Sequence, residues 1–299
     1  MKLITYIILL IIYCNHLALG FNSFIPPVSI LQKDSIKTIL FEIKSQDTEH
    51  ISYLFGTHHA FGQTFFESLN TAKQRLLKSD MLIVESLNIP GQLAEDIINQ
   101  RTIETNWLKY LSNDEYQFVE NIFSKSKVDL NKITPTELYV FLNRYYNENV
   151  CQAKQSGDEQ LSLDDYIGKV ASDNKLKLIG LETVDEQLEI IRKDVEGMPR
   201  KVHKRRLEII VQKIKSSNND NCSEIAWYKN MDFDFNFDQP CQNTLVLTNR
   251  NNKWLKELSN YLKTKNCFIA VGLSHLMFEC GLVNQLREMG YAVTPILLK

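Results

Sequence analysis

The sequence predicts an α/β fold in which a central, mostly parallel or mixed sheet is flanked by helices. Short apolar runs rich in β-branched residues alternate with longer segments of helical periodicity, and 44% of the 299 residues are hydrophobic. Strands that alternate with helices along a chain build layered α/β domains. The runs that predict buried strands are ISYLF (51–55), MLIVE (81–85), KLKLIGLE (175–182) and CFIAVG (267–272).

Two further strands are expected at the ends of this pattern. Residues 35–44 alternate between polar and apolar and should form a hairpin with ISYLF, and residues 291–298 should supply a last strand. Helices are expected where apolar residues recur at three- and four-residue spacing. The helical segments are 64–80, 136–148, 184–215, 247–258 and 283–290.

The middle of the chain, about 90–165, is predicted to be a mostly helical insertion between the second and third core strands. TPTE at 134–137 matches a capping box with proline at the first helical position, and SLDD at 162–165 marks a second helix start. No linker rich in Pro, Gly or Ser divides the chain. Residues 21–299 are therefore expected to form one domain whose insertion caps a sheet edge.

The first twenty residues predict a secretory signal peptide over 1–20. Lys2 precedes an apolar run, and small residues precede the expected cleavage after Gly20. The alternative, an uncleaved anchor, is disfavoured because the run is short for a membrane span. The mature protein is expected to be secreted or periplasmic, without a stable membrane anchor.

Cleavage would leave five cysteines in an oxidising compartment. Because five is odd, at least one is unpaired or pairs between chains. Cys222 and Cys241 bracket an irregular segment and are the expected disulfide. None of the five lies in a CxxC motif, which argues against a structural zinc knuckle.

Charge and composition argue against nucleic acid as a partner. The net charge is −2, and there is no low-complexity tract. The basic residues within 184–215 are interpreted as a solvated helix face. The segment 231–240 resembles the start of an EF-hand loop but has Phe237 where glycine is required, so it is interpreted as an extended aromatic segment. The expected partner is a peptide or small-molecule substrate.

Each of the four core runs leads into a histidine or a glutamate. ISYLF continues into GTHH (56–59), CFIAVG continues into GLSH (272–275), and the other two runs end at Glu85 and Glu182. Ligands bind outside the carboxyl ends of strands in open α/β sheets, so these residues are expected to converge on one site. By register, His58 points away from His59, which makes His59 the expected site residue.

Two imidazoles and one or two carboxylates suit a divalent metal such as Mn, Co or Zn. His59 and His275 are expected to bind it with Glu182 or Glu85, and the other glutamate would act as base. Arg250 lies near an expected helix start, where it could hold a substrate carboxylate or orient a glutamate. A plain surface arginine is the alternative.

The segments LFGTHHAF, LIVES, LIGLETVDEQL, TNRN and FIAVGLSHLMFECGLVNQLREMGYAVTPI resemble the TraB/GumN family. That family is related to TIKI metalloproteases and, more distantly, to erythromycin-esterase-like and haem-binding ChaN-like proteins. The resemblance implies two related GxxH-bearing halves and a divalent-metal-dependent hydrolase of peptide or amide bonds. It assigns the site to His59, His275, Glu85, Glu182 and Arg250.

Two further residues are accessory candidates. His58 stands where the family often has an aliphatic residue, and Asn251 lies beside Arg250 near the expected helix start. Unlike TIKI proteins, the chain is expected to have no C-terminal membrane anchor. Two other functions stay open: a metal-independent His/Glu hydrolase like the esterase relatives, and a protein that binds a peptide or haem without turnover.

Overall fold

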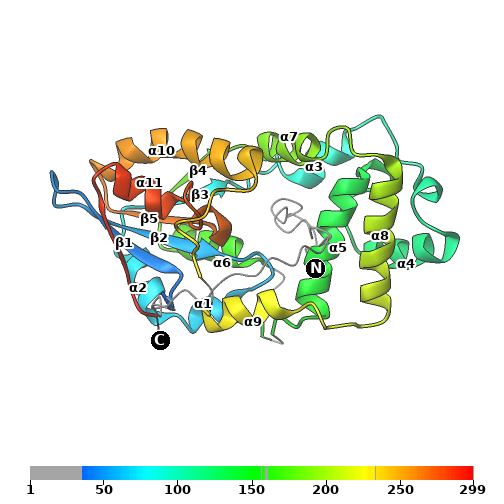
Figure 1. Cartoon of the computed structure of the whole chain (residues 1–299), viewed down its shortest axis with the longest axis horizontal. Helices are drawn as coiled ribbons and strands as arrows, with labels where there is room; N and C mark the ends of the chain where they lie inside the picture. The colour runs from blue at the N-terminus through cyan, green and yellow to red at the C-terminus, as the bar shows by residue number, and fades with distance from the viewer. Residues whose placement is uncertain (1–35, 156, 159–160, 233, 299) are drawn as a thin grey trace, which may run out of the picture.

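The computed structural model describes residues 36–155, 157–158, 161–232 and 234–298, so the predicted signal peptide lies outside the described residues. A mixed, open six-stranded sheet has the order β4-β3-β5-β2-β1-β6, which confirms the predicted α/β fold (Figure 1). The strands are β1 (Leu40–Lys44), β2 (Ile51–Thr57), β3 (Met81–Ser86), β4 (Lys177–Glu182), β5 (Cys267–Gly272) and β6 (Ala292–Pro295).

The four predicted core strands run parallel to one another as β4, β3, β5 and β2. Strand β1 forms the predicted antiparallel hairpin with β2, and β6 pairs antiparallel with β1. The register pairs Gly56 with Val271 and Thr57 with Gly272. The two GxxH segments therefore leave the sheet side by side at its carboxyl edge.

Eleven α-helices occur within the described residues. They are α1 (Gln63–Glu67), α2 (Asn70–Leu77), α3 (Ala94–Asn99), α4 (Asn113–Phe123), α5 (Pro135–Asn149), α6 (Leu163–Asp173), α7 (Val184–Asp194), α8 (Arg200–Lys215), α9 (Ser223–Asn230), α10 (Asn249–Leu262) and α11 (Leu282–Glu288). The segments 64–80 and 184–215 each hold two helices rather than one. Gly197, with φ of 79°, breaks the second segment because left-handed backbone ends a helix. None of these helices has the length and apolar composition of a membrane span.

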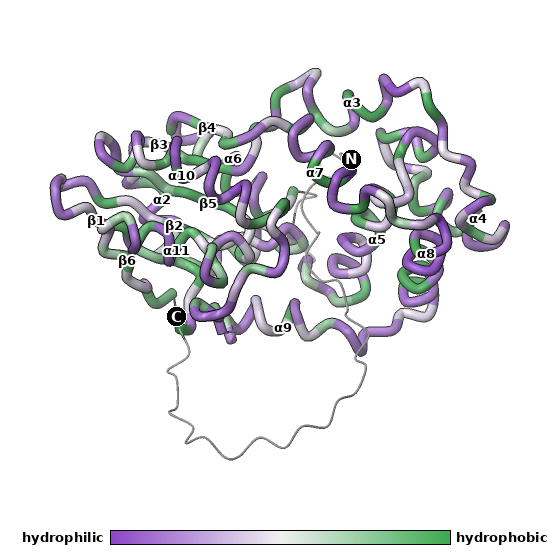
Figure 2. The backbone as a smooth tube through the Cα atoms, turned by 45° about the horizontal axis from the view of Figure 1, so that its top comes forward, coloured by the Kyte–Doolittle hydropathy of each residue, from purple (hydrophilic) through white to green (hydrophobic). Residues whose placement is uncertain are grey.

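Helices cover both faces of the sheet, with α10 and α11 on one face and α1, α2 and α6 on the other (Figure 1). Successive residues of β5 alternate between the two cores, as the pleat of a strand requires. Phe268 and Ala270 join the core under α6, while Ile269 and Val271 join the core under α10. The central strands are mainly green, the colour of hydrophobic residues, in Figure 2. This composition agrees with the burial of both of their faces.

A second, helical part lies at the other end of the long axis of the molecule (Figure 1). Helices α3, α4 and α5 fall within the predicted insertion, and α7 and α8, which follow β4, share their hydrophobic core. Helix α9 then returns to the sheet, where the Tyr228 hydroxyl donates to the Gly56 carbonyl at 2.8 Å. The helical layer thus includes more of the chain than residues 90–165.

The expected disulfide between Cys222 and Cys241 is wrong. Cys222 instead pairs with Cys151 at the end of α5, and Cys241 pairs with Cys280 beyond the second GxxH segment. The segment between Cys222 and Cys241 crosses from the helical layer to the sheet, so its two ends do not meet. The unpaired cysteine among the described residues is the buried Cys267.

Candidate functional site

Arg250 lies at the centre of a buried polar cluster at the carboxyl edge of the sheet. Its Nε donates to Glu182 at 3.1 Å, and one terminal nitrogen donates to Glu182 and, at 2.5 Å, to Glu85. The other terminal nitrogen donates to Nε2 of His275 at 3.0 Å. One guanidinium therefore joins the ends of β3, β4 and β5, and only 4% of Arg250 is exposed.

Helix α10 carries this arginine inward because of how the helix begins. A π-helical turn, η3 (Thr244–Thr248), leads directly into α10, and single π turns recur at functional sites. Arg250 and Asn251 in the first turn are both buried, and Trp254 follows on the same face one turn later. The Arg250 guanidinium lies 4.6 Å from the Trp254 ring centroid, which adds a cation–π contact.

His275 is completely buried, and both of its ring nitrogens are engaged. Asn251 donates through Nδ2 to the carbonyls of His275 and Cys280, so its Oδ1 must accept, at 2.7 Å, from Nδ1–H of His275. Nε2 of His275 then carries no proton, and its lone pair accepts the hydrogen bond from Arg250. Burial and the nearby Arg250 charge hold the pKa of His275 well below its ordinary value, so this imidazole is neutral.

Glu85 depends on the glycine of the second GxxH segment. The Gly272 N–H donates to Oε1 of Glu85 at 2.7 Å, and a Cβ at Gly272 would lie 3.2 Å from that oxygen. Burial raises the pKa of Glu85, and the neighbouring Glu182 raises it further, against the lowering effect of Arg250. Burial thus disfavours the charged form of Glu85, and its ion pair with Arg250 stabilises that form.

His59 has a different environment at the end of β2. Its Nδ1 forms a close ion pair with Oδ2 of Asp164, and Oδ1 of Asp164 accepts from the Thr57 hydroxyl at 2.5 Å. Its Nε2 has no hydrogen-bond partner within the described part of the chain, and 14% of its side chain is exposed. Burial lowers the pKa of His59, but Asp164 outweighs burial and, with Glu85, raises it above its ordinary value.

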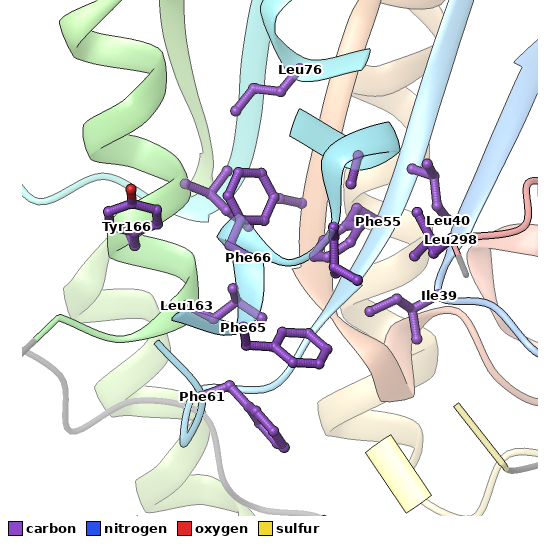
Figure 3. Close-up of a cluster of buried hydrophobic side chains, with 14 of the residues drawn as sticks. Ile39, Leu40, Phe55, Phe61, Phe65, Phe66, Leu76, Leu163, Tyr166 and Leu298 are labelled. Atoms are coloured by element: carbon purple, nitrogen blue, oxygen red, sulfur yellow. The ribbon is translucent and has the colours of Figure 1, made fainter. Parts of the chain in front are cut away.

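Helix α6 places Asp164 against His59. Ser162 caps this helix by accepting from the Asp165 N–H, and Leu163 and Tyr166 enter the core on the side of α1. Figure 3 shows these two residues in the same cluster as Phe65 and Phe66, which follow His59 in sequence. Packing of α6 on α1 therefore fixes the start of α6 beside the end of β2.

His58 turns away from His59, as its register predicts. Its Nε2 lies 3.3 Å from Glu224 on α9, and its ring packs against Phe61 and Tyr228 with centroids 5.4 and 5.2 Å away. His58 thus connects the first GxxH segment to α9 rather than to the polar cluster.

Both GxxH histidines and both glutamates therefore lie along one rim of the sheet, with Arg250 between the glutamates and His275. A family model described as the TraB/PrgY/gumN family matches residues 39–295, a range that contains all six strands. The chain belongs to the TraB/PrgY/gumN family. No curated protein and no solved structure matches it.

The donor set of this TraB/PrgY/gumN family member does not fit a divalent metal as the residues are arranged. Nε2 of His275 and both oxygens of Glu182 accept from Arg250, whose positive charge occupies the position between them. Among the described residues, no group of three or more His, Cys, Asp or Glu side chains has the geometry of a metal site. Use of Mn, Co or Zn stays a prediction, and no chemical step is derived through a metal.

Sequence reasoning missed Asp164 and Thr57 as neighbours of His59. The SLDD pattern predicts only a helix start, although one carboxylate is enough for a capping box. Asp165 performs that capping, with its Oδ2 accepting from the Ser162 N–H at 3.1 Å, which leaves Asp164 for another partner. A surplus acid in the first turn of a helix was the available signal.

Proposed function

We propose that this TraB/PrgY/gumN family member is a hydrolase that cleaves peptide or ester bonds with His59 as general base. The observation that carries the proposal is the asymmetry of the His59 ring. Nδ1 pairs with the Asp164 carboxylate, while Nε2 has no partner among the described residues and lies at the carboxyl edge of a parallel sheet. An imidazole arranged in this way can accept a proton from water.

The proposed reaction needs one water and one proton carrier. Nε2 of His59 takes a proton from water as the water oxygen bonds to the carbonyl carbon, and the carbonyl π electrons move to oxygen. The tetrahedral intermediate collapses, the bond to the leaving nitrogen or oxygen breaks, and that atom takes the proton back from Nε2. The products are an acid and an amine or alcohol, and His59 is regenerated.

Glu85 and Arg250 support this reaction, and neither of them transfers a proton in it. Glu85 is close enough to raise the pKa of His59, so its charge stabilises the imidazolium that forms during attack. Arg250 neutralises Glu85 and Glu182, which keeps two buried carboxylates beside each other. We assign Arg250 to holding the site together rather than to contacting substrate.

We also propose that the protein acts outside the cytoplasm. Two disulfides among the described residues support this, because disulfides persist in oxidising compartments. The signal-peptide pattern of residues 1–20 points to the same location.

The test is turnover of a mixed peptide library and of p-nitrophenyl esters by the mature protein, followed by mass spectrometry and absorbance. His59→Gln should lower kcat by at least roughly 10²–10⁴-fold, the usual contribution of general acid–base catalysis. His50→Gln is the matched control. His50 directly precedes β2 (Ile51–Thr57), so it lies at the opposite end of this strand from His59. Equal turnover by wild type and His59→Gln would refute the proposal.

Chelation and elemental analysis separate the alternatives. Activity that survives chelation in metal-free protein supports acid–base hydrolysis by His59. Activity lost on chelation and restored by Mn, Co or Zn would overturn this form of the proposal and support the metal prediction. A haem absorption band or stoichiometric retention of a peptide, without any turnover, would point instead to a binding protein.

A further inference from the structure

We infer that Asp164 is a positioning residue that fixes His59 in the tautomer with its proton on Nδ1 and its lone pair on Nε2. The inference deepens the proposed function and rests on it only for the effect on turnover. The protonation state of the ring can be measured without any substrate.

The assignment follows from which groups can donate. An ionised carboxylate only accepts hydrogen bonds, so at the Asp164 end both contacts must be donated by the partner. The Thr57 hydroxyl donates to Oδ1, and Oδ2 forms a close ion pair with Nδ1 of His59. Two lone pairs at such a close contact would repel each other, so Nδ1 carries the proton. A neutral ring with a proton on Nδ1 has none on Nε2.

Two features keep Asp164 ionised and in place. It lies in the first turn of α6, an eleven-residue helix whose amino end favours negative charge. The adjacent Asp165 accepts from Ser162 and from Asn88, at 2.8 Å, and so holds the helix start to the chain after β3. The two neighbouring carboxylates thus have separate partners, which provides a matched pair for mutation.

Asp164→Asn should reverse the tautomer of His59. Thr57 can still donate to the amide oxygen, which turns the amide NH₂ group toward Nδ1 of His59. Nδ1 must then accept, and the ring proton moves to Nε2. The lone pair needed to take a proton from water is lost, although the shape of the site is preserved.

The experiment is long-range ¹H–¹⁵N NMR of ¹⁵N-histidine-labelled mature protein at alkaline pH, where the imidazoles are neutral. His59→Gln identifies the His59 signals. Wild type should show the Nδ1–H tautomer, Asp164→Asn should shift it toward Nε2–H, and Asp165→Asn should leave it unchanged. In parallel, kcat of Asp164→Asn should fall by about 10²–10⁴-fold with little change in KM, as expected for a wrong tautomer.

An Nε2–H tautomer of His59 in wild type would overturn the inference, and this result needs only folded His59→Gln for the signal assignment, not a folded Asp164 variant. An unchanged tautomer in folded Asp164→Asn would also overturn it. The predicted tautomers in a protein that hydrolyses nothing would leave the inference standing and reject the proposed function.

Discussion

The two GxxH segments have the same motif and leave neighbouring strands at the same edge, yet their histidines have opposite environments. His275 is completely buried, and Asn251 and Arg250 use both of its nitrogens. His59 is partly exposed, and Asp164 uses only Nδ1. The shifts in pKa are also opposite: burial and Arg250 lower the pKa of His275, whereas Asp164 outweighs burial and raises the pKa of His59.

This difference shows that a repeated motif can divide two roles between its copies. One copy presents a ring nitrogen that can exchange a proton, and the other closes a buried hydrogen-bond network around Arg250. Buried polar networks of this kind are costly to disrupt, because each unpaired member keeps its desolvation penalty. The predictions below test this division, beginning with the largest effect.

Arg250→Met should destabilise the protein by about 3–5 kcal/mol, because it leaves Glu85 and Glu182 buried without their cation. Burial raises the pKa of Glu85, and loss of Arg250 removes the charge that lowers it. The loss of stability should therefore shrink as pH falls and Glu85 protonates, and grow as pH rises. Chemical denaturation across a pH series measures this effect.

The control for Arg250→Met is Arg192→Met, which removes an exposed arginine from an ion pair with Glu189 and should leave the denaturation midpoint unchanged. If Arg250→Met lost no more stability than this control, the buried cluster around Arg250 would not be what stabilises the site.

Asn251→Ala should cost about 1–3 kcal/mol, because it leaves Nδ1 and the carbonyl of His275 without their partner. It also removes one of the two side-chain donors to the Cys280 carbonyl, the other being Gln285. Activity should fall far less than in His59→Gln. Asn252→Ala changes the exposed neighbour and serves as the control in the same denaturation series. If Asn251→Ala abolished turnover at full stability, His275 would belong to the reacting side of the site.

The smallest effect is on the pH dependence of kcat/KM. His59 must be neutral to act as base, so activity should be lost as pH falls through its pKa, which lies above the ordinary 6.5. Glu85→Gln removes one of the charges that raise this pKa, so the acid limb should move slightly to lower pH. An acid limb that stayed in place would show that Glu85 does not influence His59.

The sequence predicted the parts of the site that depend on where strands end. Apolar runs located Glu85, Glu182 and both GxxH segments, because a buried strand has a clear composition and its carboxyl end is a known binding edge. The contacts of Asp164 with His59 and of Arg250 with three strands depend on how helices pack. The contacts of Arg250 join residues 25 to 165 positions apart, and no local pattern encodes them.

The disulfides show the same limit. Cys222 and Cys241 are close in sequence, but α9 and the segment after it lead from the helical layer to the second GxxH segment. Cys222, at the start of this segment, pairs with Cys151, and Cys241, at its end, pairs with Cys280. Spacing alone could not reveal the path.

Site-resolved modification of histidines by diethyl pyrocarbonate tests the division between the two copies most directly. In the folded protein, Nε2 of His59 should be modified in parallel with loss of hydrolysis, while His275 should stay unmodified until the protein is denatured. Modification of His275 at the rate of His59, or full activity with His59 completely modified, would contradict it.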